Sequence, residues 1–248
     1  MDRDSAETGG GSPKNGLHRG FAWVSSGRML DDFILLASVI GFLMFAYSLL
    51  MYPAQIFPDK WFPSQAASLA FKAIFSVWVL GEIVNSVWSR RNSKAKSQDR
   101  GSYWVVVVAT WIAVFSTFVF RGLDIGTFGG TLQYAGLGIA ACGIILRQWS
   151  IAVLGRHFTV RVQVREKASL ITGGPYRFAR HPSYTGSLMT FAGLPLAIGT
   201  WPGALLVFMV CMVAYAYRIS VEEDALVEAF GAEYESYRKR TWKMFPGY

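Results

Sequence analysis

Charged residues are scarce in this chain, and their scarcity excludes an ordinary soluble domain. Asp, Glu, Lys and Arg make up 16% of the 248 residues, whereas soluble domains average about 25%. Hydrophobic residues reach 52% and aromatic residues 15%. This composition, with its long apolar runs, indicates an all-α, polytopic integral membrane protein and excludes a disordered or collagen-like chain.

Cysteine and the signatures of soluble enzymes are also missing. The two cysteines, Cys142 and Cys211, lie inside apolar runs, so neither a disulfide framework nor a CxxC metal site is available. We expect no metal. The chain has no Rossmann GxGxxG after a strand, no Walker P-loop, no HExxH and no GxSxG, which leaves soluble-type nucleotide sites and hydrolase triads without support. No apolar h-region follows Met1, so a cleavable signal peptide is not expected.

The apolar runs predict the layout of the spans. Residues 1–32 are polar and rich in Gly and Ser, as in a flexible tail. Four runs then approach the roughly 20 residues that a helix needs to cross a bilayer. They are 33–52, 66–88, 103–120 and 131–154.

The stretch from Thr185 to Tyr217 is too long for one span. Turn-forming residues at 199–203 divide it, which predicts a tight helical hairpin. Its first arm, 185–198, contains Pro195 and is short for a full span. The chain then has about six hydrophobic segments, with N-terminal membrane helices in 33–130 and a C-terminal core in 131–248.

The basic residues of the loops predict the orientation. Lys and Arg are frequent in 89–102, in 155–184 and in the C-terminal tail. The alternate loops, 53–65 and 121–130, carry only Lys60 and Arg121. Because retained Lys and Arg mark the cytoplasmic side, we expect both termini and the polar blocks 155–184 and 218–248 to be cytoplasmic. The net charge of +8 then reflects topology and contact with anionic lipid, and nucleic-acid binding is not expected.

Three charges fall inside predicted spans, where an unpaired charge costs at least a few kcal/mol. They are Lys72, Glu82 and Arg147. Lys72 lies near the outer end of its helix, where snorkelling is the simpler interpretation. Arg147 lies about two turns from the cytoplasmic end of its helix, and both snorkelling and binding of an anionic group stay open.

Two further clusters lie in the cytoplasmic blocks. In 173–184, two prolines disfavour regular helix and leave backbone groups free for a ligand, although a helix-start turn with interfacial aromatics explains the same residues. At the end of the last hydrophobic run, Arg218 and Glu222 are four residues apart. An intrahelical ion pair is the default interpretation, and a site for a carboxylate and for an amine or ribose hydroxyls is the alternative. Residues 230–237 predict a short amphipathic helix.

From about Gly143 to Pro246 the sequence resembles the isoprenylcysteine carboxyl methyltransferase family, which is related to membrane phospholipid methyltransferases. The motifs follow the family's order: Leu146-Arg147, 154–159 (LGRHFT), 170–176 (LITGGPY), 180–184 (RHPSY) and Arg218…Glu222-Glu223…Phe230-Gly231-Ala232-Glu233-Tyr234…Tyr237. HPxY also occurs in related membrane sterol reductases, so the resemblance depends on all of the motifs in register. The N-terminal half differs from that of the animal members, which also have more spans.

The resemblance implies that S-adenosylmethionine binds on the cytosolic side, and it implies the residues of the site. Those for the cofactor would be Gln163, Ala168, Ser169, Leu170, Ile171, Tyr176, His181, Pro182, Ser183, Tyr184 and Glu222. Arg218 and, by position, Arg147 would be the catalytic residues that address an acceptor carboxylate from within the membrane.

The function that we expect is therefore S-adenosylmethionine-dependent methyl transfer to a lipophilic acceptor at the boundary of membrane and cytosol. Carboxyl O-methylation of an isoprenylcysteine-like substrate is the first interpretation. The alternatives are a phospholipid N-methyltransferase or a thiol S-methyltransferase, and then an NADPH-dependent membrane reductase on the same scaffold. A non-catalytic scaffold or transporter has no inverted repeat to support it. The expected partners are the lipophilic or prenylated-cysteine substrate and membrane lipid.

Overall fold

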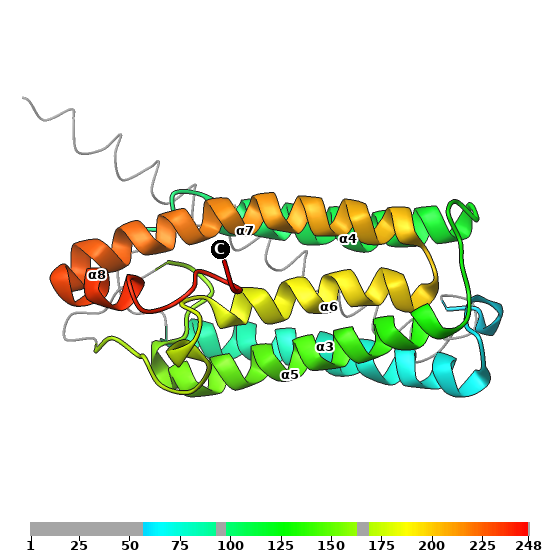
Figure 1. The fold of residues 1–248 in the computed structure, drawn as a ribbon, viewed down its shortest axis with the longest axis horizontal. Helices are drawn as coiled ribbons and strands as arrows, with labels where there is room; N and C mark the ends of the chain where they lie inside the picture. The colour runs from blue at the N-terminus through cyan, green and yellow to red at the C-terminus, as the bar shows by residue number, and fades with distance from the viewer. Residues whose placement is uncertain (1–56, 93–97, 163–168, 248) are drawn as a thin grey trace, which may run out of the picture. The chain divides into compact units, whose positions relative to one another are not determined.

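The computed structural model describes residues 57–92, 98–162 and 169–247, all within the compact unit Tyr52–Tyr248. The predicted tail 1–32 and the predicted span 33–52 lie outside the described residues. The described part is helical and contains no strand, in agreement with the predicted fold class (Figure 1). Its helices are α3 (Gln65–Asn92), α4 (Ser102–Gly122), α5 (Thr131–Leu154), α6 (Pro182–Ile198), α7 (Trp201–Phe230) and α8 (Ala232–Arg238).

Four of these helices, α3, α4, α5 and α7, are long and apolar enough to cross a membrane. Helix α6 has 17 residues, about 26 Å at 1.5 Å per residue, which is short of the roughly 30 Å hydrocarbon core. The hairpin predicted for α6 and α7 is present, and Gly199 supplies the left-handed turn with a φ of 84°. The side chain of Thr200 then caps α7 by accepting from the backbone N–H of Gly203.

Helix α7 continues well past Tyr217, where the last hydrophobic run ends, to Phe230. It has 30 residues, or about 45 Å. The apolar run ends at Arg218, but the charged residues that follow are good helix formers. The predicted amphipathic helix is also present, as α8, which begins after Gly231 with a φ of 51°.

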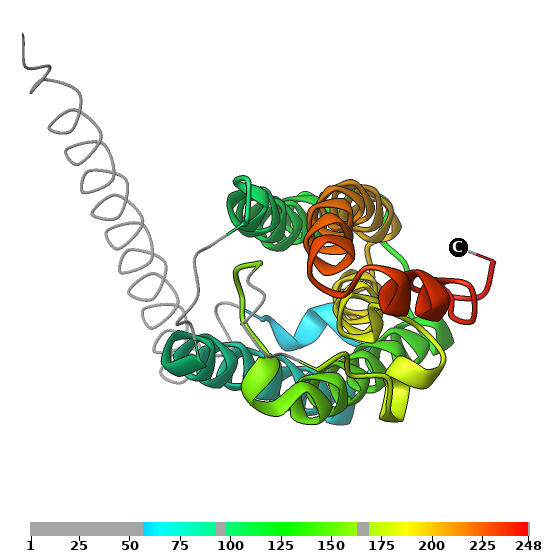
Figure 2. The ribbon, with the colours of Figure 1, turned by 90° about the vertical axis from the view of Figure 1, so that its left-hand side faces the viewer.

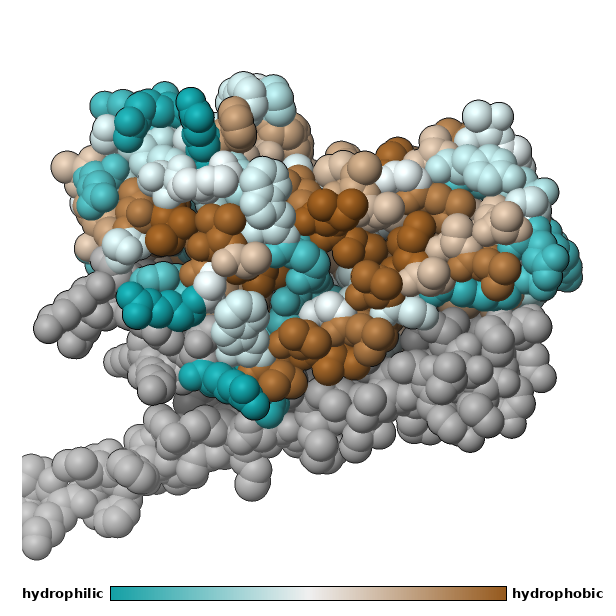
Figure 3. Space-filling view, turned by 90° about the horizontal axis from the view of Figure 1, so that it is seen from below, coloured by the Kyte–Doolittle hydropathy of each residue, from teal (hydrophilic) through white to brown (hydrophobic). Residues whose placement is uncertain are grey.

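The helices alternate in direction, so the C-terminal ends of α3, α5 and α7 share one end of the bundle with the N-terminal ends of α4 and α6 (Figure 1). Seen from that end, α6 lies between the pair α4 and α7 and the pair α3 and α5 (Figure 2). The basic segment that precedes α6, as far as the structure describes it, and α8 lie at this same end. Large apolar side chains are exposed along the spans, such as Val84, Ile145 and Val213. Hydrophobic side chains cover much of the face drawn in Figure 3, as expected where lipid replaces water.

Small residues allow α5 and α6 to approach closely. A Cβ atom added to Gly143 would lie 2.6 Å from the carbonyl oxygen of Gly186, and one added to Gly193 would lie 2.5 Å from the backbone nitrogen of Ala140. Such backbone contact is typical of membrane helices that pair through small residues. It brings the C-terminal half of α5, with Arg147, against the first turns of α6.

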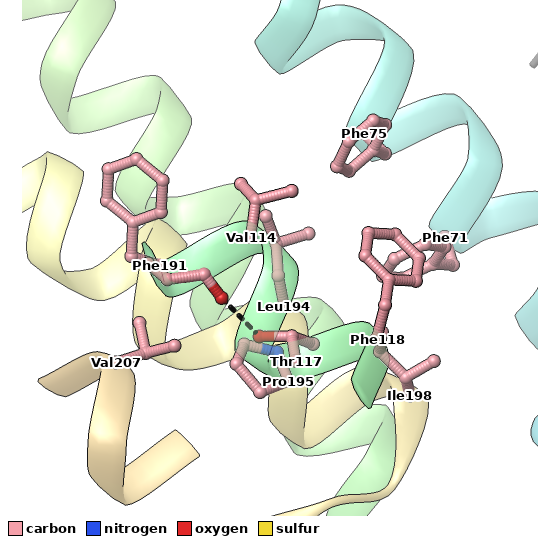
Figure 4. Close-up of a pocket in the computed structure, with 11 residues that line it drawn as sticks. Phe71, Phe75, Val114, Thr117, Phe118, Phe191, Leu194, Pro195, Ile198 and Val207 are labelled. Atoms are coloured by element: carbon pink, nitrogen blue, oxygen red, sulfur yellow. Dashed lines mark hydrogen bonds between the residues drawn. The ribbon is translucent and has the colours of Figure 1, made fainter. Parts of the chain in front are cut away.

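Aromatic rings pack against one another at the opposite end of the bundle, where α3 begins and α4 ends. Phe57 is fully buried and its ring lies 4.9 Å from that of Phe71 and 5.4 Å from that of Phe118. Beside them is a small apolar pocket between α3, α4, α6 and α7. Figure 4 shows Phe75 and Phe191 among the side chains that line it.

The close approach of α5 and α6 predicts a difference between two glycines of α5. Gly143→Ala should lower the unfolding temperature in detergent, because overpacking against fixed backbone costs about 1–3 kcal/mol. Gly138→Ala is the matched control, since a Cβ atom there meets nothing within 4 Å and Ala gains up to about 1 kcal/mol in helix propensity. Equal unfolding temperatures for the two variants would contradict the interface.

Candidate functional site

The segment before α6 and the C-terminal tail form one polar layer at the end of the bundle where α6 begins. The backbone N–H groups of Arg180 and His181 donate to the carbonyls of Trp242 and Lys243, at 2.8 and 3.0 Å. Pro182 begins α6, where a missing N–H costs nothing. This arrangement places the next side chains, from Ser183 onward, on the first turns of α6, facing the bundle.

Helix α8 packs against the same layer. The Tyr237 hydroxyl donates to the carbonyl of Tyr176, at 2.6 Å. Burial raises the pKa of Tyr237 to about 12, and it also raises the pKa of Tyr176 well above its ordinary value. Both phenols therefore stay protonated at neutral pH.

Arg218 is the most buried cation of the site, with 4% of its side chain exposed. Its Nη1 donates to Asp99 and, at 2.7 Å, to Ser102. Its Nη2 donates to the carbonyl of Val160 at 2.5 Å, and its Nε donates to the Tyr184 hydroxyl at 3.1 Å. The guanidinium thus ties α7 to α6, to the start of α4 and to the segment after α5.

Asp99 was not anticipated from the sequence, although it makes the closest ion pair of this site. Burial alone would raise the pKa of its carboxyl group, but the hydrogen bond from the Tyr103 N–H and the charge of Arg218 outweigh burial and hold that pKa below 3.8. The N–H of Val162 also donates to it, at 3.3 Å. Asp99 is therefore an ionised counter-ion of Arg218 at neutral pH.

Glu222 does not pair directly with Arg218, so the i,i+4 ion pair considered as the default is absent. Instead, the Tyr184 hydroxyl donates to Glu222 Oε2 at 2.8 Å while accepting from Arg218. Tyr184 also stacks on Tyr215, with ring centroids 5.2 Å apart. Among the ion pairs of residues 57–92, 98–162 and 169–247, none involves Glu222. Its half-buried carboxylate keeps acceptor capacity for a ligand.

Arg147 is held by a different acid. Its Nε and Nη2 donate to the two carboxylate oxygens of Glu82, at 2.5 and 2.7 Å. Its Nη1 donates to Ser183 at 3.1 Å and to Ser187 at 2.7 Å. Of the two open interpretations, snorkelling does not describe this side chain, because it is only 16% exposed and paired inside the bundle. Lys72 likewise pairs, with Asp59 at 2.8 Å.

Glu223 belongs to a separate buried cluster. Its Oε1 lies 2.9 Å from Arg180 Nε and 3.2 Å from His181 Nε2. Arg180 also donates to the carbonyl of Thr241 at 2.5 Å. This cluster fixes the tail against α6 and α7, and it already engages the ring of His181 that the family resemblance implies for the cofactor.

The structure brings together part of the predicted site. Tyr184 and Glu222 lie in one network with Arg218, while Ser183 contacts Arg147. Three predicted residues, Ser169, Leu170 and Ile171, lie in the segment before η3 (Gly174–Arg177) and are half-buried or exposed. Gln163 and Ala168 lie outside the described residues. No group of three or more metal-ligating side chains occurs in the described part of the chain.

Comparisons with known proteins show what this part of the chain is similar to. Residues 132–233 match the phospholipid methyltransferase family. A probable protein-S-isoprenylcysteine O-methyltransferase of Oryza sativa subsp. indica is 31% identical over 117 residues, 46% of this chain and 61% of the relative. The protein-S-isoprenylcysteine O-methyltransferase of Schizosaccharomyces pombe is 33% identical over 116 residues, 46% of this chain and 49% of the relative. The chain thus spans 49–61% of these curated relatives.

A solved structure supports the fold. It is that of the eukaryotic intramembrane Ras methyltransferase isoprenylcysteine carboxyl methyltransferase, which aligns with a TM-score of 0.54 and 19% identity over 88% of this chain and 86% of that chain. The predicted family resemblance and the all-α membrane fold are confirmed. The four candidate spans make this a multi-pass membrane protein.

Breaking the pair of Arg218 and Asp99 should be costly. Asp99→Asn leaves a buried charge uncompensated, which costs about 3 kcal/mol or more at pH 7. The pKa of Asp99 is lower in the folded state than in the unfolded state. Its ionised carboxylate therefore contributes to the free energy of unfolding at a pH above the unfolded-state pKa, and this contribution is lost as the pH falls through the folded-state pKa. The difference in unfolding temperature between wild type and Asp99→Asn should therefore narrow below about pH 4.

The matched control is Asp224→Asn. Asp224 pairs with Arg100 at 2.9 Å, but both side chains are more than 60% exposed, so the expected change is below about 1 kcal/mol. Equal destabilisation by the two variants at pH 7, measured by thermal unfolding in detergent, would show that Asp99 is not a buried counter-ion.

Proposed function

We propose, on the confirmed resemblance of the C-terminal half to the isoprenylcysteine carboxyl methyltransferase family, that the protein is an S-adenosylmethionine-dependent methyltransferase of lipophilic acceptors. The first candidate reaction is carboxyl O-methylation of an isoprenylcysteine-like substrate. The observation that carries this proposal is the Tyr184 hydroxyl, which links Arg218 to Glu222. One cation suited to a carboxylate and one anion suited to a cationic cofactor thus share a single tyrosine at the cytoplasmic end of the spans.

The proposed cofactor fits the donors and acceptors of this layer. S-adenosylmethionine, when bound, supplies an electrophilic methyl group on a positively charged sulfur. Glu222 accepts one hydrogen bond, from Tyr184, and can accept from ribose hydroxyls or an ammonium group. The exposed segment at Ser169 and the protonated phenol of Tyr176 lie in the same layer.

The two arginines suit orientation of an acceptor carboxylate more than neutralisation of its charge. Each guanidinium already has a carboxylate partner, Glu82 for Arg147 and Asp99 for Arg218. An acceptor carboxylate bound beside these neutral pairs keeps more of its nucleophilicity than one bound to an unpaired arginine. The acceptor carboxylate is ionised at neutral pH, so no general base is needed. Positioning and desolvation of the reactants then account for the rate acceleration.

The proposed compartment follows from the charges. The site, the described part of the basic segment that precedes α6 and the C-terminal tail lie at one end of the bundle (Figure 1). We infer from the excess of Lys and Arg there that this end is cytoplasmic, and that both termini are cytoplasmic. A cytosolic cofactor and a membrane-borne acceptor then reach the same site from two phases.

The reaction is tested with the purified chain in detergent, radiolabelled S-adenosylmethionine and a farnesylated N-acetylcysteine. The expected product is a lipophilic methyl ester, whose label is released as methanol by base. A base-stable label on a phospholipid amine would overturn carboxyl methylation but keep methyl transfer. No label on any lipid, together with no heat of S-adenosylmethionine binding, would contradict the methyltransferase proposal.

The two adjacent glutamates should behave differently. Glu222→Gln should weaken S-adenosylmethionine binding by about tenfold or more, because it removes an anionic acceptor worth about 1.5–3 kcal/mol, with little change in the unfolding temperature. Glu223→Gln should lower the unfolding temperature, since it leaves Arg180, 9% exposed, without its counter-ion. The folded Glu223→Gln protein should bind the cofactor within about threefold of wild type. Isothermal titration gives the affinities, and the reverse pattern would refute the assignment.

A further inference from the structure

One polar side chain of α3 has a buried donor without a partner. Asn85 is 3% exposed, and its Nδ2 is one of two buried side-chain nitrogen or oxygen atoms in the described part of the chain that have no hydrogen-bond partner. Buried amide donors are almost always paired, because an unpaired one loses its hydration without compensation. An unpaired one in a bundle of this kind therefore indicates a missing acceptor.

The position of Asn85 links it to both arginine networks. Glu82, Asn85 and Ser89 follow one another at i, i+3 and i+7 on α3, and such spacing places them on one face. Glu82 binds Arg147 one turn before Asn85. Ser89 Oγ, one turn after it, accepts from the N–H of Val160 at 2.6 Å.

The same Val160 residue leads to the second arginine. Its carbonyl accepts from Arg218 Nη2, at 2.5 Å. Asn85 therefore occupies the turn of α3 between the partner of Arg147 and the segment that holds Arg218. The face of α3 that carries Asn85 thus contacts both arginine networks, through Glu82 on one side and Ser89 on the other.

We propose that Asn85 is an acceptor-binding residue whose Nδ2 donates to a carboxylate oxygen of the lipophilic acceptor. The inference rests on the proposed function and adds to it a contact from α3, outside residues 132–233. A neutral amide suits this role because it fixes an oxygen without adding charge. The nucleophile is thus oriented while its negative charge is retained.

The test compares Asn85→Leu with Asn85→Asp in the purified chain. Asn85→Leu keeps the approximate volume and removes the unpaired donor, so its unfolding temperature should equal or exceed that of wild type. Its affinity for S-adenosylmethionine should be unchanged, while kcat/KM for a farnesylated N-acetylcysteine should fall about tenfold, mainly through KM. Asn85→Asp should lower kcat/KM further, because the new carboxylate repels the carboxylate of the acceptor. Ser86→Ala, on the next face of the same helix, is the control and should match wild type.

The outcomes separate the inference from the function on which it rests. If the wild-type protein methylates the probe and folded Asn85→Leu has the same kcat/KM, the role of Asn85 is overturned. The methyltransferase proposal is unaffected by that result. Loss of S-adenosylmethionine affinity in Asn85→Leu also overturns the role of Asn85 in acceptor binding, in favour of a packing or cofactor role. If wild type neither methylates nor binds the farnesylated probe in a thermal-shift titration, both proposals fail.

Discussion

Two arginines buried among membrane helices each require an acid, and the rest of the site depends on those two pairs. An unpaired guanidinium in such a bundle would cost several kcal/mol. Glu82 meets Arg147 with two parallel hydrogen bonds, the geometry that a guanidinium and a carboxylate favour. Asp99 meets Arg218, whose remaining donors fix Tyr184 and, through it, Glu222. The first network joins α3 and α5 to α6, the second joins α7 to α6, and the first turns of α6 are therefore common to both.

The two acids lie outside the part of the chain that matches the phospholipid methyltransferase family. Residues 132–233 contain both arginines, Tyr184 and Glu222, whereas Glu82 belongs to α3 and Asp99 precedes α4. Helix α3 and the segment just before α4 thus supply the counter-ions of the candidate site. Asn85, the donor that we propose for the acceptor carboxylate, also belongs to α3.

The sequence predicted the helices more fully than the contacts between them. Apolar runs located α3, α4 and α5 to within a few residues, and turn residues located the break between α6 and α7. Hydropathy alone does not locate the end of α7, because it falls at Arg218 while helix propensity does not. The family motifs identified Arg147, Tyr184 and Glu222, but Asp99 stands in a polar loop rich in charges, where no periodicity or motif distinguishes it. Its role follows from the tertiary packing of α4 on α7, which no local pattern encodes. The roles of the predicted site residues stay predictions.

The coupling between Arg147 and Glu82 is the contact on which the candidate site depends most directly. We would measure it by a double-mutant cycle of Glu82→Gln and Arg147→Gln, using the free energy of unfolding in detergent. A buried pair predicts that each single variant is strongly destabilised and that the double variant loses less than the sum by about 2 kcal/mol or more. Additive effects, within about 0.5 kcal/mol, would contradict the claim that α3 supplies the counter-ion of the site.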